Sequence, residues 1–492
     1  MRVVVIGAGL GGLSAACHLA GREHDVTVVE RGPIPGGRAG VIERAGYRMD
    51  TGPCVMTMPG LLRDVFAAAG ADMDDHVTLR PVDPMYRAVY PDGSSLRVRH
   101  GRDAMTEEIR AVCGPAEAAA FGPFCDWLGE LYRLEMPDFI DRNFDSPLDY
   151  VTRLGTLVRI IRMGGLRSVH RKVASFFDDE RLHKLFSFQA MYAGLSPFDA
   201  LAIYCVITYM DSVEGVFFPD GGMHRMATGL EAAATAAGAQ FRYGTAVARI
   251  EVSRSGGTRG VHLADGTFIP ADAVVANPDL PIAYRDLLDV PTPRVAARGR
   301  YSPSCMLWLA GVRGAMPEAA THHNIHFGSE WEGAFTDLLD RGTTMRDPSI
   351  LVTAPSLSDP SMAPEGATSL YVLEPAPNLD GTIDWRGERA RRRDDLVARV
   401  GALGYPVEVE TETYLDPVDW AEQGMERGTP FALAHTFFQT GAFRAANRDR
   451  RIPGVFFTGS STTPGVGVPM VLISGRLAAE RVRAWDRSRR RT

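Results

Sequence analysis

The apolar and polar positions of residues 2–30 predict a strand, a helix and a second strand. Val3–Ile6 is wholly apolar, as expected of a strand that is buried on both faces of a parallel sheet. Small residues dominate Gly11–Ala20, which indicates a closely packed helix. Asp25–Glu30 then carries the apolar residues of the next strand. Together these elements have the size and order of a βαβ unit.

The middle of the chain changes character several times. Residues 104–211 are mainly helical in pattern, and residues 290–425 combine strands with proline-rich loops. A hairpin and several further strands are predicted at Tyr86–Val98 around Asp92-Gly93, Gln240–Val252, Val261–Ile269 around Asp265-Gly266, and Ala273–Ala276.

The C-terminal part again predicts a buried strand, Val455–Thr458, followed by a glycine-rich loop and a helix to about Val482. A chain of 492 residues is too long for one core, so we expect two domains. The predicted fold class is α/β: a Rossmann-like nucleotide-binding domain (1–62, 215–288 and 425–492) interleaved with an α+β substrate domain (63–214 and 289–424). Such interleaving predicts a ligand cleft between the domains.

Composition and charge exclude several classes of function. Hydrophobic residues make up 45% and charged residues 23%, as in an ordinary globular protein. A net charge of -7 argues against nucleic acid as a partner. The scattered cysteines form no CxxC pair, and the first strand begins directly after Met1, so we expect a reducing, cytoplasmic compartment.

The loop after the first strand carries the first chemical motif. Gly7-Ala8-Gly9-Leu10-Gly11-Gly12 fits GxGxxG, in which the glycines allow a tight turn and a close approach to a pyrophosphate. The following helix N-terminus offers free N–H groups and partial positive charge. Glu30, at the end of the second strand, is placed to bind a ribose diol.

Two further motifs distinguish FAD from a nicotinamide cofactor. Pro35-Gly36-Gly37-Arg38 places an arginine and a second glycine loop beside the ribose, which suits a longer cofactor. Gly459–Met470 follows the last strand and opens the last helix. A second helix N-terminus at this position would stabilise the negative charge of reduced flavin. The three motifs together predict an FAD-binding oxidoreductase.

The chain also resembles the bacterial phytoene desaturases, the carotenoid desaturase family, over nearly its whole length. The motifs VVVIGAGLGGLSAA and PGGRAG are shared with many flavin amine oxidases, and the more specific stretches are Ala271–Asp279, Thr321–Gly328, Ser349–Gly366 and Gly454–Arg476. Many family members have histidine before the proline of the C-terminal signature, where this chain has Thr463.

The resemblance implies a flavin amine oxidase type of fold, non-covalent FAD, and desaturation of a C40 polyene such as phytoene towards lycopene. A quinone or oxygen would accept the electrons. By similarity the FAD contacts fall on Gly7, Gly9, Gly12, Glu30, Arg31, Gly37, Arg38, Val247, Gly459, Gly467, Val468 and Met470.

The sequence identifies no catalytic base, and Asp149 is a weak candidate whose alternative role is helix capping. The spacing of His322, His323 and His326 suggests a metal site, but no nearby cysteine or carboxylate completes it, so we expect none.

Three alternatives remain open from the sequence. A flavin amine oxidase would use a lysine near the flavin, but Lys172 and Lys184, the only lysines, both lie in the central helical stretch. A non-catalytic lipid-binding protein is disfavoured by the intact glycine motifs. A sister carotenoid enzyme, namely a 3,4-desaturase, ketolase or isomerase, would differ in tunnel shape rather than in motif.

A hydrocarbon substrate dissolves in bilayers, so we expect peripheral docking on a membrane through residues 153–176. Leu154, Leu157, Val158 and Ile161 have the spacing of an apolar helical stripe, and Gly164-Gly165 is expected to end that helix. The segment Arg153–Lys172 has six basic and no acidic residues, which suits an anionic surface. The alternative is a stripe that faces the protein's own core.

Overall fold

The computed structural model describes residues 1–22, 24–253 and 257–490. Among these residues a parallel sheet has the strand order β19-β13-β1-β2-β9. Its strands are β1 (Arg2–Ile6), β2 (Asp25–Val29), β9 (Gln240–Arg242), β13 (Ala273–Ala276) and β19 (Val455–Phe457). β1 lies at the centre with its apolar run buried, as the sequence predicts for a strand covered on both faces.

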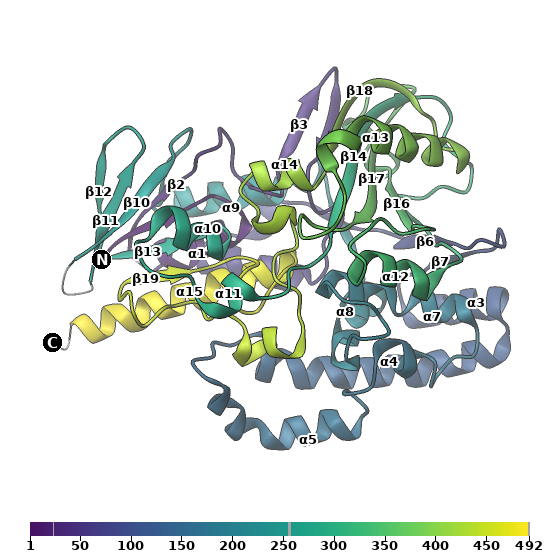
Figure 1. The fold of residues 1–492 in the computed structure, drawn as a ribbon, viewed down its shortest axis with the longest axis horizontal. Helices are drawn as coiled ribbons and strands as arrows, with labels where there is room; N and C mark the ends of the chain where they lie inside the picture. The colour runs from purple at the N-terminus through teal and green to yellow at the C-terminus, as the bar shows by residue number, and fades with distance from the viewer. Residues whose placement is uncertain (23, 254–256, 491–492) are drawn as a thin grey trace.

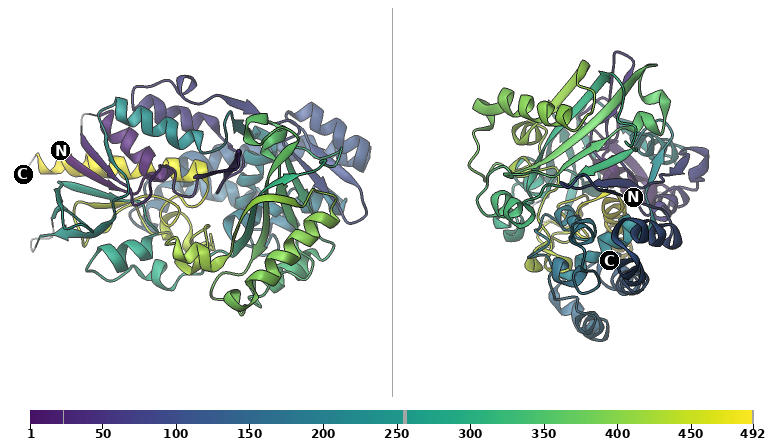
Figure 2. Two further views of the ribbon diagram at one scale, coloured as in Figure 1. Left: turned by 90° about the horizontal axis from the view of Figure 1, so that it is seen from above. Right: turned by 90° about the vertical axis from the view of Figure 1, so that its right-hand side faces the viewer.

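The two faces of this sheet are covered differently. Val3 and Val5 of β1 face a core that includes α1 (Leu10–Ala20), α2 (Pro59–Ala68), α9 (Arg225–Ala236) and α15 (Val468–Arg489). Val4 and Ile6 face a second core formed with an antiparallel sheet and with α10 (Leu280–Ile282) and η7 (Ala283–Leu287). β1 and the last helix therefore belong to one layered unit, and their outer ends lie at the same end of the molecule (Figures 1 and 2).

The antiparallel sheet has the order β10 (Val247–Val252), β11 (Thr258–Leu263) and β12 (Phe268–Pro270). The hairpin through Asp265-Gly266 is confirmed by the pairing of β11 with β12. The prediction of one strand over Gln240–Val252 is wrong. Its first residues join the parallel sheet as β9, the chain turns at Gly244 with φ +61°, and the rest forms β10.

A mixed sheet forms the other side of the molecule, in the order β18-β14-β17-β16-β15-β6-β7. Its strands are β6 (Tyr86–Val89), β7 (Ser95–Val98), β14 (Ser304–Arg313), β15 (His323–His326), β16 (Ile350–Thr353), β17 (Ala367–Ala376) and β18 (Glu408–Leu415). The predicted hairpin around Asp92-Gly93 is confirmed as the antiparallel pair of β6 and β7. Two short antiparallel ribbons also form, β3 (Val41–Arg44) with β4 (Tyr47–Asp50) and β5 (Leu79–Pro81) with β8 (Phe217–Pro219).

The region from residue 102 to 214 is mainly helical, as predicted. Its elements are α3 (Arg102–Cys113), α4 (Pro115–Glu135), η2 (Met136–Ile140), η3 (Pro147–Arg153), α5 (Leu154–Arg162), α6 (Val169–Val173), α7 (Glu180–Leu185), η4 (Phe188–Ala193), η5 (Ala202–Tyr204), α8 (Cys205–Tyr209) and η6 (Met210–Glu214). α5 ends just before Gly164, which has φ +86°, as the glycine pair predicts. Figure 1 shows α5 at the lower edge of the molecule, beyond α4.

Two helices differ from the prediction. α15 continues to Arg489, beyond the expected end near Val482. α13 (Trp385–Ala402) lies in the segment expected to hold strands and loops. Only Trp385, Leu396 and Val400 are buried in α13, so its apolar periodicity is weak, and ion pairs such as Arg392 with Glu388 support its charged face.

Glycine allows α1 and α15 to touch. A Cβ added to Gly475 would lie 2.6 Å from both the Gly11 carbonyl oxygen and Ser14 Cβ. The Ser14 hydroxyl donates to the Leu472 carbonyl oxygen at 2.7 Å, which also requires this close approach. The contact positions the two helix N-termini relative to each other.

We predict that Gly475→Ala lowers the free energy of unfolding by about 1–3 kcal/mol, because overpacking forces the two helices apart. Gly60→Ala is the matched control, since a Cβ at this helical position meets nothing within 4 Å. That control should be neutral or stabilising by up to about 1 kcal/mol. Denaturant unfolding measures both; equal stability of the two variants would contradict the packing account.

Candidate functional site

A continuous cavity of about 1080 Å³ begins at the carboxyl ends of the parallel strands and extends between the mixed sheet and the helical region. Its wall is mostly apolar. The predicted site residues that line it are Gly7, Gly9, Glu30, Arg31, Gly37, Arg38, Val247, Gly459, Gly467, Val468 and Met470. Gly12 does not line it. The carboxyl ends of parallel strands are the usual position of a ligand site in such sheets.

The first glycine loop is shaped by close backbone contacts. Gly7 has φ +94°, and its N–H donates to the Val29 carbonyl oxygen at 2.8 Å. A Cβ on Gly12 would lie 2.0 Å from the Gly7 carbonyl oxygen, so Gly12 serves packing between helix and loop. Gly9 is the N-cap of α1 and provides no side-chain cap. The first N–H groups of α1 are therefore free to bind an anion.

Glu30 organises the loops around it. Its two carboxylate oxygens accept hydrogen bonds from the N–H groups of Ala8 and Gly32, each at 2.7 Å. Val247, at the start of β10, also lines this end of the cavity. The guanidinium of Arg31 donates to the Gln423 carbonyl oxygen, so this side chain is directed towards the segment after α14 (Pro417–Glu422).

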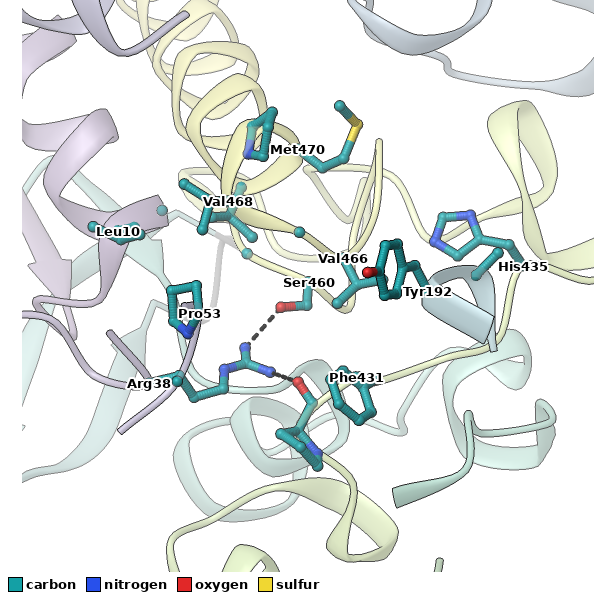
Figure 3. Close-up of a pocket in the computed structure, with 18 of the residues that line it drawn as sticks. Leu10, Arg38, Pro53, Tyr192, Phe431, His435, Ser460, Val466, Val468 and Met470 are labelled. Carbon is teal, nitrogen blue, oxygen red and sulfur yellow. Dashed lines mark hydrogen bonds between the residues drawn. The ribbon is translucent and has the colours of Figure 1, made fainter. Parts of the chain in front are cut away.

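Arg38 connects the N-terminal and C-terminal loops. It donates to Ser460 Oγ at 2.7 Å and to the Pro430 carbonyl oxygen, and its guanidinium lies 3.8 Å from the Asp279 carboxylate (Figure 3). The preceding residue, Gly37, lets the Arg38 loop pack against the first glycine loop, because a Cβ on Gly37 would lie 3.2 Å from Gly9 Cα. A cationic group thus lies where three loops meet, which suits a pyrophosphate.

A buried arginine holds the C-terminal loop. Arg444 donates to the carbonyl oxygens of Leu433, Gln439, Ser460 and Thr462. Burial lowers the pKa of Arg444 to about 10, so the group remains charged at neutral pH. Gly467 is the N-cap of α15 and, like Gly9, provides no side-chain cap. The N-terminus of α15 thus forms a second uncapped site on the cavity.

Asn277 lies between the two glycine loops. A Cβ on Gly9 would lie 2.8 Å from its Nδ2, and one on Gly459 would lie 2.9 Å from its Oδ1. The residue belongs to the Ala271–Asp279 stretch, which the sequence marks only as a family resemblance. Neither Asn277 nor Arg444 was predicted as a site residue. Each is an isolated polar residue outside any recognisable motif, so a single sequence does not indicate its role.

A histidine contacts the C-terminal loop, although Thr463 occupies the signature position. The Thr463 hydroxyl is buried and donates to the Ala445 carbonyl oxygen at 3.3 Å. The ring of His435 packs on Gly465, where a Cβ would lie 2.2 Å from its Cε1. Burial holds the pKa of His435 well below its usual range, so the ring is neutral. Figure 3 shows it close to Tyr192 and Val466.

Away from the loops described above, the cavity wall is largely apolar and carries two buried carboxyl groups. Its wall includes Phe139, Ile140, Leu157, Ile160, Phe188, Ile203, Ile207, Met210 and Leu351. Glu135, at the end of α4, lines this part, has no hydrogen-bond partner for Oε1 among the described residues, and has its pKa raised well above the usual range by burial. Asp211 lines it from η6, and burial raises its pKa to about 6.

The structure places Asp149 away from this wall. It is the third residue of η3, where its carboxylate accepts from the N–H groups of Asp145 and Ser146 in a capping box. It is not among the cavity-lining residues. This geometry favours the capping role over the catalytic one.

The three histidines and two lysines have local partners. His322 contacts Ser358 Oγ at 2.8 Å, His323 contacts Thr353 Oγ1 at 2.7 Å, and His326 contacts the Tyr405 hydroxyl at 2.9 Å.

The ammonium of Lys172 lies over the ring of Trp127 at 4.6 Å, and Lys184 donates to the Gly328 carbonyl oxygen. Neither lysine lines the cavity, which removes the lysine expected of an amine oxidase from the site.

The two uncapped helix N-termini, the glycine cradles and Arg38 fit one extended, anionic dinucleotide. Residues 10–483 match the family of flavin containing amine oxidoreductases. The chain is 46% identical to "Phytoene dehydrogenase" of Streptomyces griseus, with 98% of this chain and 94% of the relative covered. It is 38% identical to the "zeta-carotene-forming phytoene desaturase" of Myxococcus xanthus, with 98% and 94% covered.

The fold is also found in solved structures. An oxidoreductase from Methanosarcina mazei superposes with a TM-score of 0.63 at 18% identity, covering 98% of this chain and 100% of that one. The cofactor is FAD, as the family and the loops both indicate. The chain therefore belongs to the flavin-containing amine oxidoreductases, in the branch that contains the bacterial phytoene desaturases.

Proposed function

We propose that this protein desaturates a C40 carotenoid precursor, phytoene, towards lycopene, with FAD as the hydride acceptor. The observation that carries the proposal is the continuity of the cavity, which joins a dinucleotide cradle to a long apolar compartment. A site for a small amine needs no such compartment. The substrates named for the two relatives support the same class of substrate.

In this proposal, residues 1–62, 215–288 and 425–492 form the unit that holds FAD. The N-terminus of α1 and Arg38 would bind the pyrophosphate, Glu30 would bind the ribose, Val247 would contact the adenosine part, and the N-terminus of α15 would meet the flavin ring. When bound, FAD supplies a two-electron oxidant that accepts a hydride from an allylic carbon. A quinone or oxygen would serve as the electron acceptor.

The chain's own residues bind and orient the hydrocarbon. Apolar side chains from α5, η4 and α8 replace water around the polyene, because burial of apolar surface is the main binding force open to a hydrocarbon. The same water exclusion protects an allylic cation from solvent while the second C–H bond breaks.

The second possibility is a sister carotenoid enzyme, such as a 3,4-desaturase, ketolase or isomerase. Those activities would use the same cradle and differ in the length and end groups of the tunnel. The buried carboxyl of Glu135 on the tunnel wall favours this possibility over an amine oxidase, because it offers a hydrogen bond to an oxygenated end group.

We further propose that the protein docks on a membrane through α5 and the adjoining loops. Leu154, Val158 and Ile161 are 54%, 43% and 44% exposed, so three of the four residues of the predicted stripe face outward. Leu148, Val151, Leu166, Phe437 and Phe438 are exposed as well, and the Phe437 ring reaches Tyr150 of η3 through the ring of Phe443. Leu157, Leu166 and Phe437 also line the cavity, so a hydrocarbon entering here would leave the bilayer directly. None of the described helices combines the length and apolarity required to cross a bilayer.

The basic residues of this segment contribute less to the proposed membrane binding than their number suggests. Arg153 pairs with Asp138, Arg159 pairs with Glu130, and Lys172 stacks on Trp127. Local carboxylates therefore neutralise part of the positive charge, and the apolar side chains supply most of the proposed docking energy.

We predict that Glu30→Ala weakens FAD binding by about 1–3 kcal/mol, or about 5–150-fold in Kd, because it removes the ribose acceptor. Equilibrium dialysis with apoprotein measures this change. Glu43→Ala, on exposed β3 away from the cavity, is the control and should bind FAD normally. Unchanged affinity in the Glu30 variant would show that its role is wrongly assigned.

FAD-loaded protein supplied with phytoene in liposomes and a quinone or oxygen should form conjugated polyenes that absorb visible light. Chromatography identifies the products and the number of desaturation steps. Protein without FAD is the control. If no coloured polyene forms while FAD is bound and both acceptors are present, phytoene is the wrong substrate and a sister activity is favoured.

The triple variant Leu154→Ser, Val158→Ser, Ile161→Ser should lose about 100-fold in liposome partitioning, because each side chain contributes about 1 kcal/mol at an interface. Flotation with FAD-loaded protein measures it. The control is Leu403→Ser with Val407→Ser, a pair of exposed apolar residues elsewhere on the surface. Equal flotation of both variants would place docking on another surface.

A further inference from the structure

Asp211 is a buried carboxyl group on a wall otherwise suited to a hydrocarbon. The residue is 7% exposed and lines the cavity from η6, a π-helical turn. Such turns interrupt a helix at an energetic cost and often mark functional positions. An ionisable group in an apolar compartment is costly unless it has a use there.

The groups around Asp211 are neutral. Gln189 of η4 donates to its Oδ2 at 3.2 Å, and hydrogen bonds from Tyr86 of β6 and from Ser212 partly offset the effect of burial. Tyr192 of η4 and Cys54, in the loop after β4, are the other titratable groups that sense its charge. Among the described residues none of its recorded partners is a lysine or arginine. The carboxylate is therefore held by dipoles and is not neutralised by an ion pair.

This carboxylate belongs to the part of the cavity next to the flavin cradle. Tyr192 lies near His435 and Val466 of the C-terminal loop (Figure 3). Cys54 directly follows Pro53, which lies on the other side of the cradle near Leu10 and Arg38 (Figure 3). Asp211, Tyr192 and Cys54 all line the cavity, and burial together with the charge of Asp211 raises the pKa of the other two groups. We therefore place Asp211 near the position where a polyene would meet the flavin.

We propose that Asp211 is the proton acceptor of the desaturation. One C–H bond of a –CH2–CH2– unit breaks and its electron pair leaves as hydride to FAD, which is reduced by two electrons. The neighbouring C–H bond breaks next, its electron pair becomes the new C=C bond, and its proton passes to an Asp211 carboxylate oxygen. The carboxyl then releases this proton to water, and the quinone or oxygen named above reoxidises the flavin.

A carboxylate at this position acts twice on the reaction. Before it takes the proton, its negative charge in an apolar medium stabilises the allylic cation left by hydride departure. With a pKa of about 6, Asp211 is mostly ionised at neutral pH, and it is a stronger base than an ordinary carboxylate. This inference rests on the proposed function.

The first test is single-turnover reduction of FAD-loaded protein by phytoene without oxygen. Asp211→Asn, which keeps the size and a hydrogen-bond acceptor, should slow flavin reduction by about 10²–10⁴-fold and leave phytoene affinity unchanged. The wild-type rate should rise with pH through about 6 and then level off, whereas the variant should show no such step. Asp211→Glu should recover part of the rate.

The matched control is Glu214→Gln. Glu214 lies on the same turn and its pKa is also raised by burial, but it does not line the cavity. It should keep the wild-type rate and pH profile. Glu135→Gln tests the other buried acid: if that variant loses the rate and the pH step while Asp211→Asn keeps them, the proposal is overturned. Wild-type protein that fails to react with phytoene would instead refute the proposed function.

A second readout needs no substrate. Burial raises the pKa of Asp211 from 3.8 to about 6 in the folded protein, so the fold loses stability as pH rises from about 4 to about 6, and the loss stays constant at higher pH. Asp211→Asn should therefore raise Tm at about pH 8, and the gain should vanish near about pH 4. A Tm that falls at both pH values would show that the carboxyl only supports the structure, and would overturn the proposal even if the rate were low.

Discussion

The close approach of three backbone segments at Asn277 is the constraint on which the rest of the structure depends. The loop before α1, the segment after β13 and the loop after β19 come so close that a side chain at Gly9, Gly11 or Gly459 would meet the Asn277 amide within 3 Å. Contact between α1 and α15 through Gly475 requires the same proximity. Segments from both ends of the chain thus place two uncapped helix N-termini on one cavity.

Several other features follow from this junction. Because the cradle is built from backbone N–H groups and the side chains of Arg31 and Arg38, the remaining wall is free to be apolar. Arg444 provides the opposite kind of support, since its buried charge is used entirely on carbonyl oxygens that hold the C-terminal loop. The cavity therefore combines a polar cradle with an apolar compartment, in which an ionised carboxylate such as that proposed for Asp211 would have a large electrostatic effect.

The sequence predicted the elements whose signals are local. The apolar run of β1, the glycine loop before α1, the hairpin of β6 and β7, and the buried strand β19 are all confirmed, because burial and turn chemistry act over a few residues. The break between β9 and β10 was missed, since an alternating pattern does not show which sheet a strand joins. α13 was missed because its buried face consists of only three residues. Asn277, Arg444 and Asp211 are recognised by the groups that surround them in space, so one sequence without those neighbours could not identify them.

The most direct test of the account is a crystal structure of the protein with FAD bound. We expect the pyrophosphate at the N-terminus of α1 near Arg38, the adenine ribose on Glu30, and the flavin ring at the N-terminus of α15 with one face open to the apolar compartment. If the flavin ring bound away from α15, or if its accessible face were closed off from Asp211 and the hydrocarbon wall, the central claim that both chain ends build one desaturase site would be contradicted.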